Sequence, residues 1–141
     1  MRRRPLRTAF TLVEILIVVV ILGILAGIMV PQFASATQQS RVTASIDQLE
    51  KLRRAIGVYY VRNSCFPDVS EGNGTWGALI SPSYMRSPPV NAWVNGTGSK
   101  RILLRDTADT EYQFTDGWIY DPITGRVWAG GFSDQDEPFT P

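Results

Sequence analysis

A single acidic residue, Glu14, lies within a run of apolar and small residues that extends from Phe10 to Val30. A helix over this run is about 31 Å long at a rise of about 1.5 Å per residue, which matches a hydrocarbon core of about 30 Å. A charge at the centre of a membrane helix costs about 2.5–3.5 kcal/mol on insertion scales, and less near an end. The run therefore predicts a membrane-spanning helix, and the acid within it predicts a partner that compensates its charge.

The charges that flank the run predict its orientation in a membrane. Few positive charges follow the run before Arg41, but four arginines precede it: Arg2, Arg3, Arg4 and Arg7. Because positively charged flanks stay on the cytoplasmic side, we expect a cytoplasmic N-terminus and a C-terminal part across the membrane. The chain then divides into a basic leader (1–9), a transmembrane helix (10–30), an amphipathic continuation of that helix (31–62) and a small globular domain (63–141).

The composition argues against an enzyme and against direct binding of nucleic acid. Removal of the leader leaves 10 of the 14 basic residues against 13 acidic ones, which changes the formal charge from +1 to −3. The chain has no histidine and one cysteine, which excludes histidine-dependent nucleophilic triads and zinc sites built from histidine and cysteine. The lone Cys65 cannot form an intrachain disulfide, and we expect a half-buried thiol beside Phe66.

Two interpretations of the N-terminus follow from the residues alone. The small residues Ala34-Ser35-Ala36 resemble the cut site of a secretory signal peptide, which predicts a periplasmic or secreted binding protein that begins at Thr37. Signal peptides, however, have apolar regions of about 7–15 residues, which is shorter than this run, and Glu14 does not suit one. A chain that is not cleaved would instead be a membrane-anchored sensor domain.

The stretch AFTLVEILIVVV, from Ala9 to Val20, resembles the N-terminal signal of type IV pilins and type II secretion pseudopilins. The resemblance implies that a prepilin peptidase cuts between Ala9 and Phe10 on the cytoplasmic side and N-methylates Phe10. The family has glycine before the cut, whereas this chain has Ala9, the next smallest side chain. The resemblance also implies a subunit that is stored in the bacterial inner membrane and extracted by an inner-membrane assembly platform. Copies of such a subunit stack with one another and with other pilin-like subunits into a filament.

This cut would give Glu14 a cation nearby. A free α-amino group is largely cationic at neutral pH, so each cleaved chain would carry one anion and one cation on the same short stretch of helix. Pairing within one chain is conceivable, but pairing between axially staggered chains satisfies both groups and builds a polymer. The resemblance implies the second arrangement, in which Glu14 of one subunit meets Phe10 of the next. An acid that stays protonated near the membrane interface is the alternative.

Three residues near the end of the run bear on how such helices pack. Gly23 and Gly27 have a spacing that lets membrane helices approach closely, although glycine is common in membrane helices in general. Pro31 cannot donate a hydrogen bond to the carbonyl of Gly27. We therefore expect residues 23–31 to be the weakest part of the helix, and the resemblance implies that this segment is kinked or melted in filaments.

After the apolar run the sequence keeps a helical period and becomes amphipathic. One apolar stripe has residues three or four positions apart: Val42, Ile46, Leu49, Leu52, Ile56 and Tyr59 or Tyr60. Asp47 with Lys51 and Glu50 with Arg54 are acid-first pairs on the other side, and we expect the Arg53 head group to extend to water. The stripe predicts the side of a long helix that carries the globular domain.

Short β-prone runs follow in the C-terminal part: Ile102 to Leu104, Tyr112 to Phe114, Trp118 to Tyr120 and Arg126 to Ala129. Proline and glycine in DPITG, residues 121–125, predict a hairpin between the last two runs. Earlier, Thr75 could cap a short helix from Trp76 to Ile80. We therefore predict an α+β, pilin-like fold in which a long N-terminal helix packs on a small antiparallel sheet of three or four strands.

The C-terminal half is acidic, with Arg126 the expected counter-charge after Arg105. The acids are Asp106, Asp109, Glu111, Asp116, Asp121, Asp134, Asp136 and Glu137. The resemblance implies calcium in this region, because major pseudopilins often bind it there and calcium prefers oxygen-rich loops. This sequence has no ligand loop of recognisable spacing, so no cofactor is expected. A solvated acidic surface, or one that meets the basic helix face of a neighbouring subunit, is the default interpretation.

Together these features predict a structural filament subunit that is most like a major pseudopilin of a type II secretion system. The modest domain and the lack of a C-terminal cysteine pair favour a pseudopilin over a type IV pilus pilin, which would serve adhesion, twitching motility or DNA uptake. The presence of Glu14 argues against a tip subunit that lacks this acid.

Overall fold

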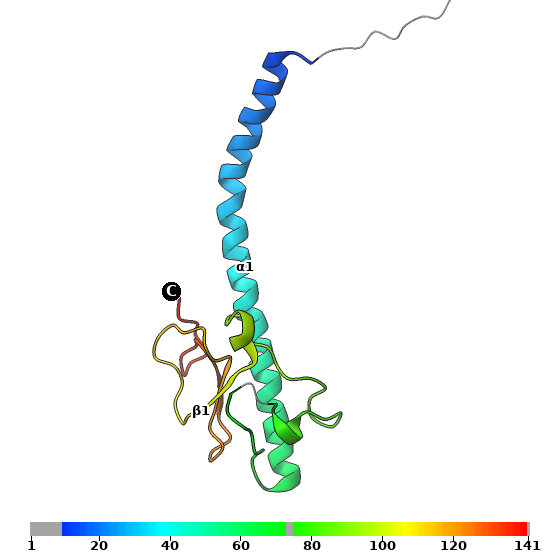
Figure 1. Cartoon of the computed structure of the whole chain (residues 1–141), viewed down its shortest axis with the longest axis vertical. Helices are drawn as coiled ribbons and strands as arrows, with labels where there is room; N and C mark the ends of the chain where they lie inside the picture. Colours follow the sequence, from blue (N-terminus) through cyan, green and yellow to red (C-terminus); the bar gives the residue numbers. More distant parts are fainter. Residues whose placement is uncertain (1–9, 73–74, 141) are drawn as a thin grey trace, which may run out of the picture. The chain divides into compact units, whose positions relative to one another are not determined.

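The computed structural model describes residues 10–72 and 75–140. The chain divides into two compact units, one that ends at Thr37 and one that begins at Gln38, and helix α1 (Leu12–Asn63) contributes to both (Figure 1). The predicted leader, residues 1–9, lies outside the described residues.

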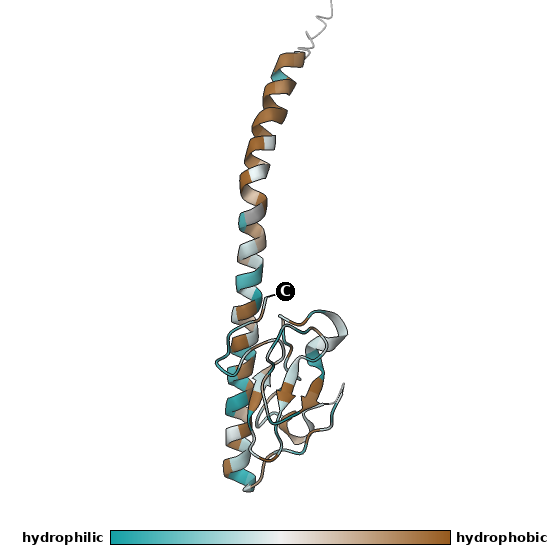
Figure 2. Ribbon diagram, turned by 90° about the vertical axis from the view of Figure 1, so that its left-hand side faces the viewer, coloured by the Kyte–Doolittle hydropathy of each residue, from teal (hydrophilic) through white to brown (hydrophobic). Residues whose placement is uncertain are grey.

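Helix α1 changes character along its length. Its first part is almost entirely apolar, whereas its second part alternates polar and apolar residues (Figure 2). The helix ends where Ser64 takes a left-handed conformation with φ 57° and donates its backbone N–H to the Tyr60 carbonyl over 2.8 Å, a common way to satisfy a helix C-terminus. The expected helix exit near residue 63 is thus confirmed.

The apolar stripe of α1 forms one wall of the core of the second unit. Leu49, Leu52 and Ile56 are at most 3% exposed. They belong to one core cluster with Trp118 and Phe132, and the remaining stripe residues pack around it: Val42, Ile46 and Tyr59. The predicted acid-first pairs are also present, with 2.6 Å between Lys51 and Asp47 and 3.8 Å between Arg54 and Glu50.

The sheet of the second unit consists of β1 (Ile102–Leu104), β2 (Trp118–Tyr120) and β3 (Val127–Ala129), in the order β1-β2-β3. Strands β2 and β3 are antiparallel and are joined by the predicted DPITG hairpin, in which the Gly125 N–H donates to the Asp121 carbonyl over 2.8 Å. Strands β1 and β2, however, are parallel. The prediction of an all-antiparallel sheet was therefore wrong. A connection of about a dozen residues, 105–117, lets the chain cross over before β2 begins.

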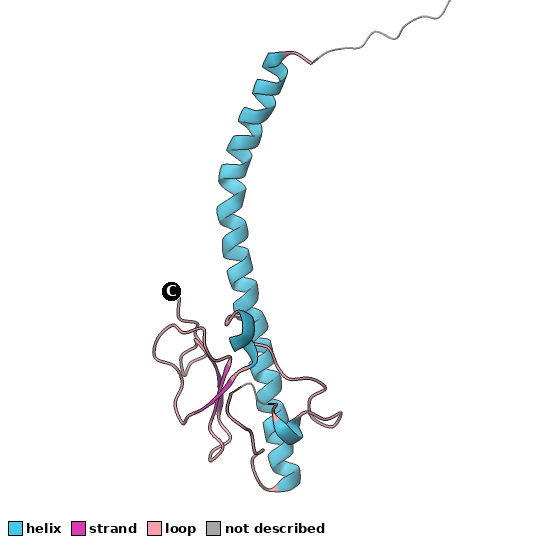
Figure 3. Cartoon of the chain, viewed as in Figure 1, coloured by secondary structure: helices cyan, strands magenta, loops and turns pink. Residues whose placement is uncertain are grey.

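The predicted strand from Tyr112 to Phe114 does not form. This segment is loop, and the side chain of Gln113 accepts hydrogen bonds from the backbone N–H groups of Thr115 and Asp116 over 2.7 and 3.0 Å. A glutamine that bonds its own turn offers the backbone an alternative to a strand ladder. Most of the second unit outside α1 is also loop, as Figure 3 shows.

Two short 3₁₀ helices, η1 (Gly77–Leu79) and η2 (Gly96–Lys100), precede the sheet. The predicted helix from Trp76 to Ile80 is thus a single turn, and Trp76 rather than Thr75 takes the N-cap position, without a side-chain bond. Cys65 is exposed, in contrast to the expected half-buried thiol.

A buried asparagine ties α1 to the loops around the sheet. The Asn91 side-chain oxygen accepts from the Ser45 hydroxyl of α1 over 2.7 Å and from the Trp93 N–H over 2.9 Å. Its amide nitrogen donates to the Gly117 and Gly130 carbonyls over 2.9 and 3.0 Å. All four hydrogen-bonding positions of the amide are therefore used.

Arg53 provides a second tie between α1 and the C-terminal part. Its guanidinium donates to both carboxylate oxygens of Asp136, over 2.6 and 2.9 Å, and to the Val127 carbonyl. Its head group reaches water, as expected, since the side chain is 40% exposed. It is not free there, because the chain returns an acid and a carbonyl to this side of the helix.

Candidate functional site

The N-terminus of α1 is a capping box formed by Thr11 and Glu14. The Glu14 N–H donates to the Thr11 hydroxyl oxygen over 3.2 Å, and Glu14 Oε2 accepts from both the backbone N–H and the hydroxyl of Thr11, each over 2.8 Å. Such a box satisfies donors that a helix N-terminus leaves unpaired, and an acid in the first turn suits the helix dipole. Glu14 therefore has a structural role within one chain in addition to the role expected from the sequence.

Thr11 is the site residue that the sequence reasoning did not single out. The signal was present, because Thr11-Leu12-Val13-Glu14 has the spacing of a threonine and a glutamate in a capping box. The apolar run begins at Phe10, so the run by itself did not show that the helix begins at Leu12 and that Glu14 lies in its first turn.

Both hydrogen bonds that the Glu14 carboxylate accepts use Oε2, so among the described residues the second oxygen, Oε1, has no hydrogen-bond partner. Phe10, whose nitrogen would be the new terminus after cleavage, has a side chain that is 80% exposed. Ala9 lies outside the described residues. The structure thus places Phe10 and Glu14 at the same end of the helix and leaves one carboxylate oxygen open.

The surface around Glu14 is apolar and uncovered. Every large apolar residue from Leu12 to Val30 is at least 48% exposed, and α1 is long and apolar enough to cross a membrane. An exposed apolar surface of this extent marks a site of contact with lipid or with other chains.

Gly23 and Gly27 lie on this surface with open space beside them. A methyl group built at either position would meet nothing within 4 Å, so both leave room for a neighbouring helix. Residues 23–31 are helical without interruption in the single chain. The expected loosening at Pro31 concerns the assembled filament and stays a prediction.

The acids of the C-terminal half are paired with more arginines than the sequence suggested. Besides Arg105 with Asp109 and Arg126 with Asp134, at 2.6 and 2.9 Å, two further pairs connect distant segments. These are Arg53 with Asp136 at 2.6 Å and Arg101 with Asp116 at 3.1 Å. Among the described residues, no three acids, cysteines or histidines come close enough together to hold a metal ion.

At Asp109, the donors that converge do not suit the calcium that the resemblance implies. Asp109 is surrounded by N–H groups of Arg105, Gln113 and the backbone. Calcium instead requires about six to eight oxygen ligands at about 2.3–2.6 Å.

Asp121 has a role in the β2–β3 turn. The Thr124 hydroxyl and the Ile123 N–H both donate to its carboxylate. The hydrogen bond from Thr124, and to a lesser extent the one from Ile123, lowers the pKa of Asp121 below its ordinary value. This acid therefore stabilises a turn, and its buried oxygens are already used within the hairpin.

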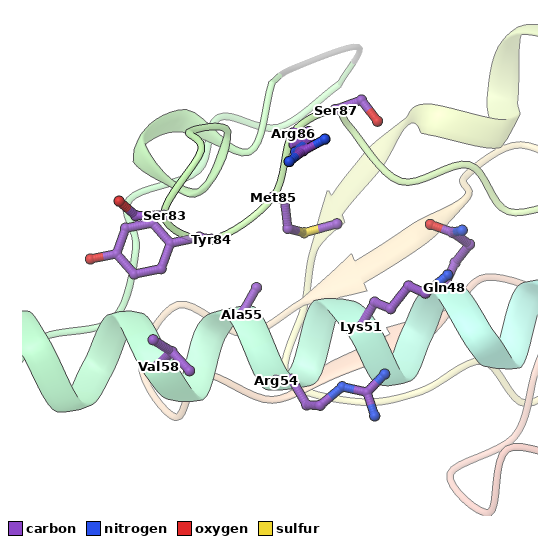
Figure 4. A pocket seen from close by; sticks show the side chains of 10 residues that line it. All are labelled: Gln48, Lys51, Arg54, Ala55, Val58, Ser83, Tyr84, Met85, Arg86 and Ser87. Atoms are coloured by element: carbon purple, nitrogen blue, oxygen red, sulfur yellow. The ribbon is translucent and has the colours of Figure 1, made fainter.

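A groove with a volume of about 560 Å³ lies beside α1 in the second unit. Lys51, Arg54 and Val58 of α1 line it together with Met85 and Arg86 of the following loop. Figure 4 shows Ala55 of α1 pointing toward Met85, whereas the Arg54 side chain extends away from that loop. Two of its cations are paired with acids one helical turn earlier, so the groove is only weakly basic.

Comparisons with known proteins identify the N-terminal segment of the chain. Residues 4–30 match the family model described as the prokaryotic N-terminal methylation motif. An apolar N-terminal helix that carries this motif, followed by a small α+β unit, defines the class of type IV pilin-like proteins.

Relatives of two kinds are similar over most of the chain. Type II secretion system core protein G of Pseudomonas aeruginosa is 35% identical over 114 residues, which is 81% of this chain and 76% of that protein. The protein of the same name from Vibrio cholerae is 33% identical over 114 residues, 81% of this chain and 74% of that protein. The type IV major pilin protein PilE1 of Neisseria gonorrhoeae is 32% identical over 127 residues, 88% of this chain and 69% of that protein. No solved structure matches the chain. The chain therefore belongs to the pilin and pseudopilin family that includes type II secretion system core protein G.

Proposed function

We propose that this chain is a structural subunit of a pilus-like filament that supports protein secretion, as a type II secretion pseudopilin. It is held in the bacterial inner membrane by residues 10–30, with its N-terminus in the cytoplasm and its globular unit in the periplasm. A prepilin peptidase cuts between Ala9 and Phe10 and methylates the new terminus. An inner-membrane assembly platform then stacks the subunit with copies of itself and with other pilin-like subunits.

The observation that carries this proposal is the geometry of Glu14. It is the one ionisable residue between Leu12 and Val30, and its Oε1 is free of partners among the described residues while Oε2 is held by Thr11. A cationic α-amino group on a neighbouring, axially staggered chain can bind Oε1 without breaking the capping box. An ion pair of this kind offsets the cost of an acid within the membrane.

The processing step is tested by the mass and N-terminal sequence of the mature protein. The proposal expects N-methylated Phe10 at the terminus. A terminus at Thr37 would support the secretory signal peptide instead, although Ala34 to Ala36 lie inside α1. A terminus at Met1 would support an uncleaved membrane anchor.

The role of the Glu14 charge can be separated from its role in the cap. In Glu14→Gln the side chain can still accept from Thr11, because glutamine also serves in capping boxes, but the negative charge is lost. Thr11→Val removes the cap and keeps the charge. We expect Glu14→Gln and Glu14→Ala to insert into the membrane and to assemble few or no filaments, whereas Thr11→Val still assembles.

Filaments counted by electron microscopy, with membrane fractions as the control for insertion, measure both effects. Normal assembly of Glu14→Gln would show that the charge is not needed and would refute the pairing with Phe10. Failure of Thr11→Val alone would assign Glu14 to the cap only.

A type IV pilus pilin is the second candidate function. The similarity to PilE1 over 88% of this chain supports it. The two functions share the cleavage and the helix-based assembly, and they differ in what the filament does. Deletion of the gene separates them, since loss of protein secretion indicates a pseudopilin, and loss of adhesion, twitching motility or DNA uptake indicates a pilus.

A further inference from the structure

The connection between β1 and β2, residues 105–117, is organised around one carboxylate. The Asp109 side chain is 8% exposed. Its Oδ1 accepts from Arg105 Nη2 over 2.6 Å, and its Oδ2 accepts from Gln113 Nε2 and from the Gly131 N–H, each over 2.8 Å. This carboxylate therefore joins the two ends of the loop and the chain that follows β3.

The two side chains that bind Asp109 also hold the loop backbone. Arg105 Nε donates to the Thr107 carbonyl over 2.9 Å. Gln113 Nε2 donates to the Asp116 carbonyl over 2.8 Å, in addition to the bonds that its oxygen accepts from the following residues. Two branches of hydrogen bonds thus start at the Asp109 carboxylate, one through Arg105 to the Thr107 carbonyl and one through Gln113 to the Asp116 carbonyl.

A metal ion at Asp109 would have to share the carboxylate with a guanidinium that is already bound to it. Both oxygens of Asp109 already accept from N–H groups, and a cation would be repelled by the positive ends of those donors. Asp116, another acid of this loop, is also paired, since Arg101 Nε donates to its Oδ1 over 3.1 Å. Arginine is permanently charged and its donors form a rigid planar fork, so it can bind a carboxylate and a backbone carbonyl at the same time.

We propose that the Arg105 guanidinium is the resident cation of this loop and takes the structural place that a divalent cation would otherwise fill. The domain then folds, and remains folded, without calcium. This inference does not depend on the proposed function, because it concerns the stability of the second unit alone.

The first test is the response of the mature full-length protein, in detergent micelles, to metal. Unfolding is followed by tryptophan fluorescence in EDTA, in millimolar CaCl₂ and in NaCl of equal ionic strength. The proposal expects the three melting temperatures to agree within about 1 °C, because a ligand that does not bind the native state does not stabilise it. A melting temperature that rises by several degrees in CaCl₂, or falls in EDTA, would overturn the proposal.

The second test removes the arginine. Arg105→Gln leaves a largely buried carboxylate without its cation, and we expect the melting temperature to fall by about 5 °C or more. Arg54→Gln is the matched control, since Arg54 also pairs with an acid four residues away, but on the exposed surface at 3.8 Å. We expect this control to change the melting temperature by less than about 3 °C. Equal effects of the two substitutions would refute the role of Arg105, and if Arg105→Gln does not fold, the metal test on the unaltered protein still decides.

Discussion

Replacement of Asn91 by alanine tests whether the buried amide holds α1 to the sheet loops. The substitution removes four hydrogen bonds, but some of the partner groups keep another hydrogen bond and one does not. The Ser45 hydroxyl has one proton, which it can then give to the Arg41 carbonyl 2.9 Å away, and it still accepts from the Trp93 N–H over 3.0 Å. The Gly117 carbonyl still accepts from the Gly130 N–H over 2.9 Å.

The Gly130 carbonyl is the group that is left without a partner. An unsatisfied buried carbonyl costs about 1–3 kcal/mol, and each of the other three lost bonds contributes about 0.5–1.5 kcal/mol. The expected loss in the free energy of unfolding is therefore roughly 2.5–7.5 kcal/mol, which is a large part of the roughly 5–15 kcal/mol by which domains are stable.

Urea unfolding of the full chain in detergent, followed by tryptophan fluorescence, measures this loss. Asn95→Ala is the control, because Asn95 is exposed and makes no side-chain cap bond to η2. It should change the free energy of unfolding by no more than about 0.5 kcal/mol. A cost below about 1 kcal/mol for Asn91→Ala would show that water or a local shift replaces the amide, and the accounting of its partners would be wrong.

Three further predictions concern the β2–β3 hairpin. Burial, and to a lesser extent nearby negative charge, raises the pKa of the Tyr120 phenol. Its contribution to stability is therefore present below about pH 10 and is lost at higher pH. Tyr120→Phe should flatten this alkaline loss of stability, as measured by fluorescence-monitored unfolding. The Thr124 hydroxyl lowers the pKa of Asp121, so the contribution of Asp121 to stability is lost as the pH falls below the ordinary carboxyl value. The stability of Asp121→Asn should therefore depend less on acidic pH, as measured by circular dichroism. Gly125 has φ 71°, and an added methyl group would meet the Phe66 ring. Gly125→Ala should therefore lower the free energy of unfolding by more than about 1 kcal/mol, which a lower melting temperature would show.

The parts of the fold that were predicted correctly follow from patterns within a few residues of each other. The apolar stripe of α1 has a period of 3.6 residues and buries Leu49, Leu52 and Ile56 as that period requires. The DPITG turn joins adjacent strands, and its proline and glycine have local conformational reasons for their positions. Such features need no knowledge of the rest of the chain.

The features that were missed depend on residues far apart in sequence. The parallel pairing of β1 with β2 depends on how residues 105–117 are held, and that depends on a bond between Asp109 and the backbone of Gly131. No local pattern of Tyr112 to Phe114 shows that Gln113 will bond its own turn. The capping box is the exception, because its two residues are three positions apart and the sequence alone could have revealed it.

If the proposed function holds, Glu14 lies near the membrane interface before assembly and between subunits after it. One carboxylate oxygen has a partner in the single chain, and the other gains one in the filament. Before assembly, the Thr11 bonds to Oε2 offset part of the cost of an acid near the membrane interface. The nitrogen of Phe10 is then an uncharged amide as long as the leader is attached, so this nitrogen offers no cation to Oε1. Cleavage converts that amide into a cationic amine and thereby creates the second partner. Assembly then adds an ion pair to a capped helix and does not exchange one bond for another. The leader would thus suppress premature polymerisation through the charge that its removal creates.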